Sequence, residues 1–330
     1  MIRARAYWST GVGVGELREV EVADAAPGQS LVRASCSGIS RGTERLVGAG
    51  RVPLSGYDQM KCRSMGGAFP FPVKYGYALV GLGIDGALAD QRIFVMHPHQ
   101  EVATINDEDA ILLPDTVPSP RATLFANLET ALNAVWDAPE PTTENAPARP
   151  LIVGAGAVGL LIGFCCRHEW GRTVDVIEED TARRAAISTL PWVHEALSPA
   201  DAEGRSAPVA WHTSGSPRGL QTALDAVGFE GFVVDLSWYG DTPVTLDLGS
   251  GFHWDRKRII SSQVAHVAPR QRSGEDAGFS TRRDRVLALL EDPALDALLA
   301  PPTPFDDLPR TMAAIHHGGG PAPHPVITYA

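Results

Sequence analysis

The feature that most constrains the fold is the stretch 151–178, LIVGAGAVGLLIGFCCRHEWGRTVDVIE. An apolar run, a glycine-rich turn, a helical pattern and a second apolar run follow one another, which predicts strand, turn, helix and strand. In such a unit the glycines permit a tight turn, close approach of a pyrophosphate, and close packing of helix on strand. The helix N-terminus adds free N–H groups and a positive dipole end that favour phosphate. The candidate dinucleotide-binding residues of this turn are Gly154, Gly156, Ala157, Val158 and Gly159.

Glu178 ends the second apolar run, 178 − 159 = 19 residues beyond the last glycine of the turn. A carboxylate at a spacing of about 20 residues accepts hydrogen bonds from the ribose hydroxyls of a dinucleotide. Because the same carboxylate repels a 2′-phosphate, Glu178 predicts that NAD is preferred over NADP.

Length and charge limit the possible classes of protein. A chain of 330 residues exceeds what one hydrophobic core usually supports, which predicts two domains. The net charge of −11 and the lack of an extended Lys/Arg cluster argue against nucleic acid and anionic membranes as partners. The sequence has neither an apolar run of about 18 residues nor a signal-peptide pattern at its start. We therefore expect a soluble, cytoplasmic protein that acts on a small molecule.

The four cysteines, at positions 36, 62, 165 and 166, contain no CxxC pair. This spacing predicts neither a structural zinc lobe nor a disulfide framework. Cys165 and Cys166 lie in the expected helix after the glycine turn, where we expect small buried thiols.

The chain before the glycine turn predicts a β-rich domain followed by a helix. Residues 1–118 contain short β-like runs separated by Gly and Pro, which is typical of a compact β domain. Residues 119–136 have helical periodicity, and the Pro-rich segment 137–150 predicts a surface connection.

After the glycine turn, helical and apolar segments alternate, which predicts a parallel sheet with crossover helices. We expect helices at 181–190 and 220–227, and strands at 209–212, 231–236 and 259–262. Ligands bind beyond the carboxyl ends of such strands. The turns after two of these strands contain the candidate cofactor-binding residues Ser214, Gly215 and Ser237, and ordinary loop turns are the alternative.

The C-terminal residues are too few for a core of their own, so we expect them to pack on the N-terminal domain. They contain an Arg-rich connection, two helical patterns and an apolar run, at 269–283, 285–290, 305–315 and 325–329. The predicted domains of this α/β chain are therefore 1–118 together with 266–330, and 119–265.

Several motifs resemble the medium-chain dehydrogenase/reductase superfamily. Val32 to Glu44, VRASCSGISRGTE, is similar to its first catalytic-loop motif, and Pro72 to Val80, PVKYGYALV, to its Gly-His-Glu segment. Phe305 to Ile315 is similar to its last helix. The resemblance implies a GroES-like β-rich catalytic domain, a Rossmann domain and a homodimer. The stretches GISRGTERLVGAGRVP and GYALVG are similar to a zinc-lacking branch that includes the bacteriochlorophyllide 2-hydroxyethyl dehydrogenases, which hints at a bulky apolar substrate.

The sequence departs from the superfamily at the catalytic zinc. The three positions at which its zinc enzymes carry ligands read Ser40, Tyr77 and approximately Ala126 here. A hydroxyl, a phenol and a methyl group do not form a zinc site at neutral pH, and the four-cysteine lobe is missing too. We therefore expect no bound metal.

The resemblance implies catalytic roles near the vacated zinc position. Thr43 matches a hydroxyl relay and is the first candidate for passing a proton, and Tyr77 places a phenol nearby. Ser40 can donate weakly, and His99 can be a general acid. Glu44 is expected to orient Arg41 or a backbone group. A tyrosine packed in the β-rich core and an ordinary loop histidine are the alternatives for Tyr77 and His99.

Two further residues match cofactor contacts of the superfamily. Thr130 corresponds to a position that touches the nicotinamide, and Arg183 to one that stacks over adenine. A helix-interior threonine and an exposed helix arginine are the alternatives.

Together these observations predict a zinc-independent, NAD(H)-dependent oxidoreductase that interconverts an alcohol and a carbonyl by hydride transfer. An NADPH-dependent enone or quinone reductase of the same fold is one alternative. A catalytically silent dinucleotide-binding protein is another.

Overall fold

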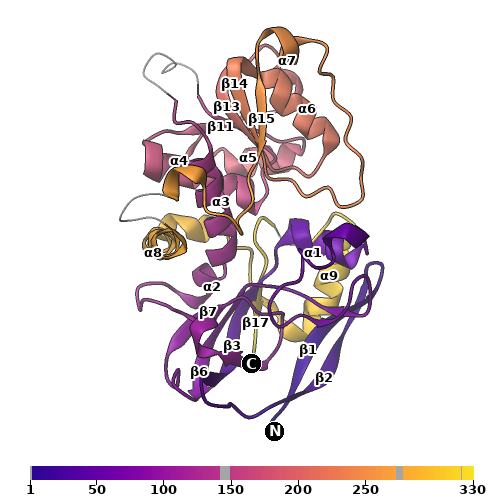
Figure 1. Cartoon of the computed structure of the whole chain (residues 1–330), viewed down its shortest axis with the longest axis vertical. Helices are drawn as coiled ribbons and strands as arrows, with labels where there is room; N and C mark the ends of the chain where they lie inside the picture. Colours follow the sequence, from indigo (N-terminus) through magenta and orange to yellow (C-terminus); the bar gives the residue numbers. More distant parts are fainter. Residues whose placement is uncertain (1, 142–148, 273–277, 321) are drawn as a thin grey trace. The chain divides into compact units, whose positions relative to one another are not determined.

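The computed structural model of the chain describes residues 2–141, 149–272, 278–320 and 322–330. It divides into two compact units, one formed by residues 1–126 and 287–330 and the other by residues 127–286 (Figure 1). The sequence placed these boundaries at 118/119 and 265/266. The connections expected at 137–150 and 269–283 include residues 142–148 and 273–277, which lie outside the described residues.

The first unit is built on β-sheets, as expected of a β-rich domain. Its strands are β1 (Ile2–Gly11), β2 (Val14–Val22), β3 (Gln29–Gly38), β4 (Gly66–Gly67), β5 (Val73–Lys74), β6 (Leu79–Asp85), β7 (Arg92–Val95), β8 (Val102–Asn106), β9 (Ile111–Leu112), β16 (Thr303–Pro304) and β17 (Val326–Thr328). One sheet has the order β2-β1-β5-β4. The other has the order β16-β17-β3-β6-β7-β9, with β8 paired to β3.

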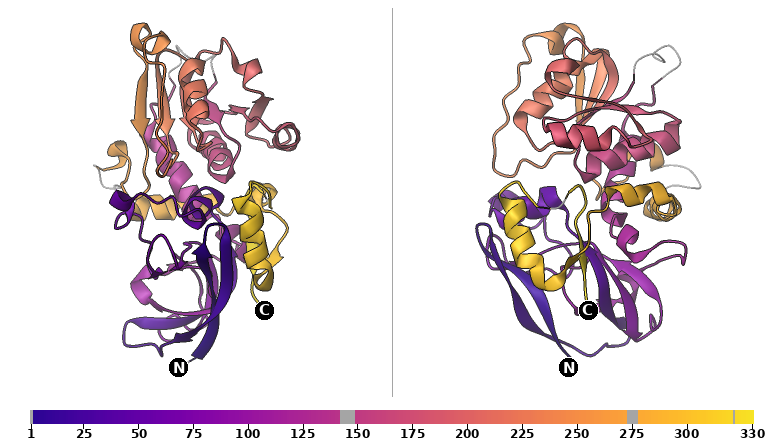
Figure 2. Two further views of the ribbon diagram at one scale, coloured as in Figure 1. Left: turned by 90° about the vertical axis from the view of Figure 1, so that its right-hand side faces the viewer. Right: turned by 180° about the vertical axis from the view of Figure 1, so that it is seen from behind.

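The C-terminal segment packs against the N-terminal strands of this unit. Helix α9 (Leu308–His316) contacts β2 and helix α1 (Arg41–Gly48), and β17 pairs antiparallel with β3 (Figure 2). Leu308 and Ile315 of α9 are fully buried in one cluster with Tyr7. Each such leucine or isoleucine contributes about 1.5–3 kcal/mol relative to an exposed side chain, which ties the tail to this unit.

The single helix predicted at 119–136 is two helices, α2 (Ser119–Ala122) and α3 (Phe125–Asp137). Thr123 caps the C-terminus of α2, and its hydroxyl donates to the Pro120 carbonyl at 2.6 Å. The apolar periodicity continues across the break because both helices bury an apolar face, so periodicity alone does not reveal it.

The second unit contains a six-stranded parallel sheet of order β12-β11-β10-β13-β14-β15. The strands are β10 (Leu151–Val153), β11 (Val174–Ile177), β12 (Val193–Leu197), β13 (Ala207–His212), β14 (Val227–Asp235) and β15 (Arg258–Ser261). The helices of the unit are α3, α4 (Ala157–Trp170), α5 (Thr181–Ile187), α6 (Pro217–Ala226), α7 (Gly251–Trp254) and α8 (Phe279–Leu289). The expected parallel sheet with crossover helices is confirmed.

Strand β12 was not predicted. It lies at one edge of the sheet, and only its two terminal residues, Val193 and Leu197, are buried. An edge strand whose middle faces solvent lacks the continuous apolar run that identified the other strands of this sheet.

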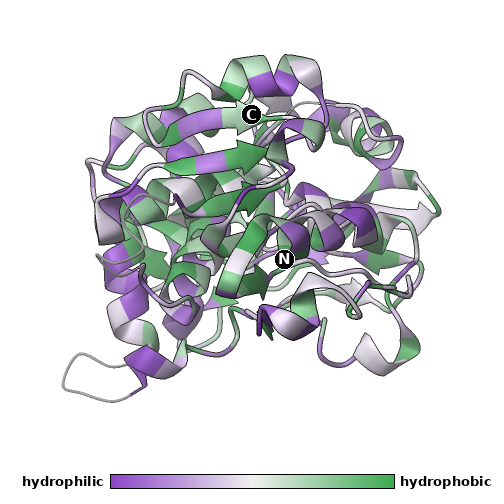
Figure 3. Ribbon diagram, turned by 90° about the horizontal axis from the view of Figure 1, so that it is seen from above, coloured by the Kyte–Doolittle hydropathy of each residue, from purple (hydrophilic) through white to green (hydrophobic). Residues whose placement is uncertain are grey.

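Helix α4 follows the glycine-rich turn and is apolar around most of its surface. Its residues 159–166 are buried, and Gly171, in the left-handed conformation, ends it. Cys165 and Cys166 are fully buried, which confirms the expected thiols. Figure 3 shows that the sheet strands carry largely hydrophobic residues. No helix in the described part of the chain combines the length and apolar character that a membrane span requires.

Candidate functional site

The glycine-rich turn of the second unit has the geometry of a phosphate cradle. Gly154 has φ +106°, and a Cβ there would lie 2.7 Å from the backbone nitrogen of Ser214. A Cβ on Gly159 would lie 2.2 Å from the carbonyl oxygen of Gly154. A Cβ on Gly156 would meet no atom within 4 Å, so its backbone borders open space. The first and third glycines are therefore needed for the turn, and the second leaves room for a ligand.

Helix α4 begins directly after Gly156, which is its N-cap and offers no side chain to the helix amides. The amides of Ala157, Val158 and Gly159 belong to the first turn, where helix N–H groups have no partner within the helix. These amides and the positive end of the helix dipole suit a pyrophosphate. The residues at the turn fit the nicotinamide dinucleotide that the fold implies.

Glu178 lies close to this turn and is held from three sides. Its Oε2 accepts the Ala155 amide at 3.1 Å and the Arg183 guanidinium at 3.2 Å, and its Oε1 accepts the Asp180 amide at 3.0 Å. The residue is 8% exposed, whereas the Arg183 side chain is 40% exposed. The structure thus brings the predicted ribose acid and the predicted adenine-stacking arginine together.

The turns after β13 and β14 also meet. The Ser237 hydroxyl accepts the Gly215 amide at 3.0 Å, and the Gly154 backbone borders Ser214. Three predicted cofactor residues, Ser214, Gly215 and Ser237, therefore lie together beside the glycine-rich turn. Thr130 lies in α3 of the same unit and is half-buried.

Two polar residues at the ends of these strands were missed by sequence reasoning. His212 is the last residue of β13, and Asp235 is the last residue of β14. The His212 ring bonds through Nδ1 to Asp235 Oδ1 at 2.9 Å and through Nε2 to Ser214 Oγ at 2.7 Å. The sequence did contain a signal for them. Each is a polar residue that ends an apolar strand just before a turn with candidate cofactor-binding residues.

In the first unit, three catalytic candidates meet at the start of α1. The Tyr77 hydroxyl hydrogen-bonds with the side chains of Ser40 and Thr43. Ser40 is the N-cap of α1 and is buried, Thr43 lies in its first turn, and Tyr77 lies two residues before the start of β6 at Leu79. Burial raises the pKa of Tyr77 to about 12, although both hydrogen bonds oppose the rise. The phenol is therefore protonated throughout the neutral range and can donate.

His99, the fourth catalytic candidate, lies in a buried hydrogen-bonded chain. Its Nε2 bonds to Glu44 Oε2 at 2.9 Å, and its Nδ1 bonds to Ser37 Oγ at 2.7 Å. Ser37 Oγ in turn bonds to the Tyr329 hydroxyl at 2.8 Å. His99 is 1% exposed and Glu44 3% exposed. The ring therefore orients Glu44 rather than facing a ligand directly.

Glu44 links this chain to the hydroxyl cluster. Its Oε1 accepts the backbone amide of Ser40 at 2.8 Å, which fits the expectation that it orients a backbone group. This bond fixes the first turn of α1, on which Ser40 and Thr43 lie. The chain from Tyr329 to Glu44 thus holds the two hydroxyl partners of Tyr77 in place.

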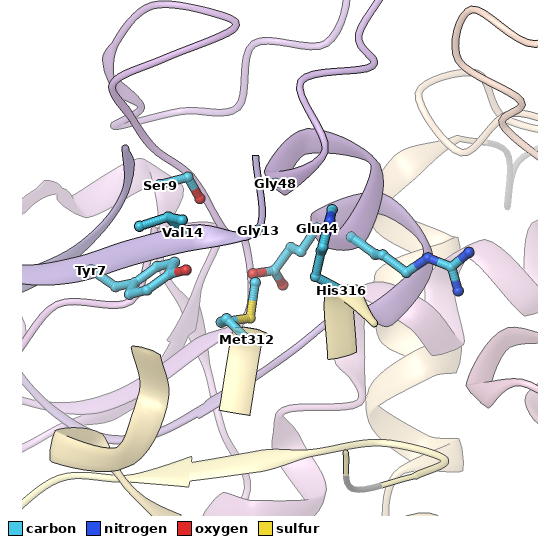
Figure 4. A pocket seen from close by; sticks show the side chains of 9 residues that line it. Tyr7, Ser9, Gly13, Val14, Glu44, Gly48, Met312 and His316 are labelled. Carbon is cyan, nitrogen blue, oxygen red and sulfur yellow. The ribbon is translucent and has the colours of Figure 1, made fainter. Parts of the chain in front are cut away.

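A small cavity of about 10 Å³ lies beside Glu44, whose carboxylate points between Tyr7 and Met312 (Figure 4). It is lined by Tyr7, Ser9, Gly13, Val14, Glu44, Arg45, Gly48, Met312 and His316. This volume suits about one water molecule, so the cavity is no substrate pocket. A second cavity, of about 350 Å³, is lined by residues 265–267, 272, 278 and 279, which include none of the candidates.

Comparisons with known proteins place the fold. No protein-family model and no curated protein sequence matches the chain significantly. Solved structures match over nearly the whole chain. One is a dehydrogenase of Sinorhizobium meliloti that is assigned as zinc-binding and is bound to NADP, with 16% identity and a TM-score of 0.76 over 99% of this chain and 100% of that chain.

Two Escherichia coli enzymes are similar in the same way. A short chain alcohol dehydrogenase complexed with NADH has 14% identity and a TM-score of 0.73, covering 99% of each chain. L-idonate 5-dehydrogenase has 12% identity and a TM-score of 0.78, covering 99% of this chain and 98% of that chain.

The chain shares the fold of these dehydrogenases, which agrees with the fold that the medium-chain dehydrogenase/reductase resemblance predicted. The expected GroES-like β-rich unit and Rossmann unit are confirmed as fold classes. At these sequence identities, the similarity shows the fold alone. The chemistry must be inferred from the residues of the site.

Zinc is the metal that this superfamily fold implies, and the residues present do not fit it. Ser40 and Tyr77 offer a hydroxyl and a phenol whose pKa burial raises to about 12, and Ala126 offers no donor. Zinc prefers thiolate, imidazole and carboxylate ligands. Within the described ranges, no group of three or more His, Cys, Asp or Glu side chains is placed to hold a metal ion.

Proposed function

We propose that the protein is a zinc-independent, NAD(H)-dependent oxidoreductase that interconverts an alcohol and a carbonyl. The observation that carries this proposal is the cradle formed by the glycine-rich turn, the free N-terminus of α4 and Glu178. A nicotinamide dinucleotide, when bound, supplies or accepts the hydride. The chain's own residues must then bind it, orient the substrate and handle one proton.

Tyr77 is the group that we assign to the proton. Its protonated phenol donates to the carbonyl oxygen during reduction, in place of the polarisation that a metal would provide. Thr43 and Ser40 hold the phenol by hydrogen bonds and can return a proton to it. His99 acts as a positioning residue through Glu44, which fixes the helix turn that carries both hydroxyls.

We propose NAD(H) as the preferred cofactor because a 2′-phosphate would approach the Glu178 carboxylate. Three donors hold this carboxylate in place, so it cannot turn aside without losing hydrogen bonds. Arg183 bonds to Glu178 at 3.2 Å, and its side chain is 40% exposed, so we propose that its guanidinium stacks on adenine. Thr130, Gly215 and Ser237 are proposed to face the nicotinamide half.

An aromatic cluster beside Tyr77 supports a bulky apolar substrate. The rings of Tyr57 and Phe69 are 5.5 Å apart, those of Phe69 and Tyr75 are 5.7 Å apart, and those of Tyr75 and Tyr77 are 6.2 Å apart. Phe69 and Tyr75 are each 6% exposed, so the partly exposed rings of Tyr57 and Tyr77 are the ones that can offer apolar surface to a substrate. We therefore propose an extended or aromatic alcohol or ketone as the substrate class.

Steady-state assays with matched substrates test the proposed reaction. Small alcohols, aromatic alcohols, the corresponding ketones and enones are each tested with both nicotinamide cofactors. We expect turnover of the aromatic alcohol and ketone pair with NAD(H). Turnover of enones alone with NADPH would instead indicate an enone or quinone reductase, and cofactor binding without any turnover would indicate a catalytically silent binding protein.

The superfamily resemblance also leads us to propose a homodimer. Light scattering should then give twice the chain mass of 35.2 kDa. A mass equal to one chain across the micromolar range would contradict the dimer and leave the proposed reaction untouched.

A further inference from the structure

The ends of β13 and β14 place a serine, a histidine and an aspartate in one hydrogen-bonded row. Ser214 Oγ lies 2.7 Å from His212 Nε2, and His212 Nδ1 lies 2.9 Å from Asp235 Oδ1. His212 is fully buried, Asp235 is 15% exposed in its side chain, and Ser214 is exposed. A buried base between a half-buried acid and an exposed hydroxyl is the arrangement of a nucleophilic serine.

The hydrogen bonds around Asp235 indicate which ring nitrogen of His212 carries the hydrogen. Asp235 Oδ1 accepts the Ser237 amide at 3.0 Å, and its Oδ2 accepts the Tyr239 hydroxyl at 3.0 Å. The Tyr239 and Ser237 hydroxyls also lie 3.1 and 3.2 Å from His212 Nδ1. An ionised carboxylate can only accept, so Nδ1 carries the ring hydrogen. Nε2 then carries no hydrogen, and its lone pair can accept the proton of the Ser214 hydroxyl.

Helix α6 begins beside the serine. Ser214 Oγ accepts the Ser216 amide at 3.2 Å, and Ser216 is the N-cap of the helix. The first-turn amides of a helix have no acceptor within it, and here they belong to Arg218 and Gly219. A Cβ on Gly219 would lie 2.2 Å from Ser214 Oγ and 2.8 Å from His212 Nε2. The serine is thus close to unpaired amides that favour a developing oxyanion.

We propose that Ser214, His212 and Asp235 form a second active centre that hydrolyses small activated esters. Ser214 Oγ attacks the ester carbonyl and transfers its proton to His212 Nε2. The carbon–oxygen bond to the leaving group breaks, and the alcohol leaves with that proton. A water molecule then attacks the acyl-serine, gives a proton to His212, and releases the acid as Ser214 regains its proton. Asp235 holds the ring in place through its hydrogen bond to Nδ1.

The substrate class follows from the exposure of Ser214. The hydroxyl lies at a surface turn, and Ser214 is exposed. A small ester with a short acyl chain and a good leaving group can therefore reach the hydroxyl from solvent. Ester hydrolysis needs no hydride and is measured without any nucleotide, because Ser214 also lies among the predicted cofactor residues beside the glycine-rich turn.

Site-resolved labelling with a short-chain alkyl fluorophosphonate tests the proposal. This reagent transfers its phosphonyl group to activated serines and releases fluoride. Ser198 is a matched control, because its hydroxyl bonds to Asp201 at 2.6 Å without a histidine partner. We expect mass spectrometry to find Ser214 labelled at least about a hundredfold faster than Ser198, the typical effect of a general base. We also expect p-nitrophenyl acetate hydrolysis that Ser214→Ala abolishes.

Two variants separate chemistry from folding. Asp235→Asn should slow labelling of Ser214 at least about a hundredfold. The amide favours the His212 tautomer with its hydrogen on Nε2, which cannot accept the Ser214 proton. Gly219→Ala places a Cβ 2.2 Å from the Ser214 hydroxyl and 2.8 Å from His212 Nε2, so it should displace the hydroxyl and slow labelling at least about tenfold, and circular dichroism checks that the variant is folded. Equal labelling of the two serines, or no ester hydrolysis that depends on Ser214, would overturn the proposal.

Discussion

The phenol of Tyr77 is the residue on which the proposed reaction depends most. Tyr77→Phe removes the proton donor and keeps the ring, so we expect kcat to fall by about 10²–10⁴-fold with little change in KM. Thr43→Ala should lower kcat less, because Ser40 still bonds the phenol.

Tyr75→Phe is the matched control for this experiment. Tyr75 packs edge-on against Tyr77, but its hydroxyl donates to the Met60 carbonyl at 3.1 Å. Its loss should cost about 1 kcal/mol of stability and leave kcat within about twofold. Equal losses of kcat in the two variants would mean that packing, and not proton transfer, explains the effect.

Two buried histidines make the stability of the first unit dependent on pH. Burial lowers the pKa of His97 and of His324 from 6.5 to about 4. Between these values the unfolded chain binds a proton on each ring and the folded chain does not. The stability is therefore complete above pH 6.5 and falls as the pH decreases toward 4, by about 3 kcal/mol for each ring.

Urea unfolding of the full chain between pH 7 and pH 4.5 checks this dependence. Carboxylates titrate in the same range, so His324→Gln is compared with the unmodified chain. The variant should show a shallower fall of the unfolding free energy with decreasing pH. Identical slopes for the two proteins would show that His324 does not contribute.

For single residues, spacing along the chain predicted the glycine turn and the positions of Glu178 and Arg183 beside it, because the whole motif lies within one strand, one helix and the next strand. The partners of the catalytic candidates could not be predicted in this way. Glu44 and His99 are 55 positions apart, and His212 and Asp235 are 23 apart. Which polar residues meet depends on strand order and register, and one sequence alone does not contain that information directly.

In the turn before α4, one glycine is needed for folding and another is proposed to be needed for cofactor binding. A Cβ on Gly159 would lie 2.2 Å from a backbone oxygen, so Gly159→Ala should destabilise the chain by about 1–3 kcal/mol. A Cβ on Gly156 meets only open space, so Gly156→Ala should change stability by less than about 0.5 kcal/mol. The same methyl projects into the cradle and should weaken NADH binding at least about tenfold, or 1.4 kcal/mol.

Thermal unfolding and NADH titration of both variants check this pair. Gly11→Ala is the control, because a Cβ there also meets no atom within 4 Å but lies in β1 of the first unit. Unchanged NADH affinity in Gly156→Ala would place the pyrophosphate elsewhere.

The elements themselves followed from periodicity where one face or both faces are buried. The buried strands β10, β11, β13 and β14 and helix α4 were recognised as apolar runs or helical patterns. Strand β12 was missed because its middle is exposed, and the break between α2 and α3 was missed because buried apolar residues continue across it. Burial pattern therefore decides which elements a sequence reveals.

For the molecule as a whole, the fold and its two units agree with the sequence, and the proposed chemistry assumes that Ser40, Tyr77 and Ala126 hold no zinc. We predict that dialysis against a strong zinc chelator leaves the rate of hydride transfer unchanged within about twofold. Metal analysis before and after dialysis accompanies the assay. Loss of activity that returns on adding zinc would show that this fold holds its metal with residues other than Ser40, Tyr77 and Ala126.

Calorimetric titration of the purified full chain with NADH and with NADPH measures the cradle at the start of α4 without requiring a known substrate. We predict saturable binding of one NADH per chain, tighter than the binding of NADPH, with the heat of NADH binding reduced in Gly156→Ala. If neither NADH nor NADPH gave any heat of binding, the result would contradict the proposed function.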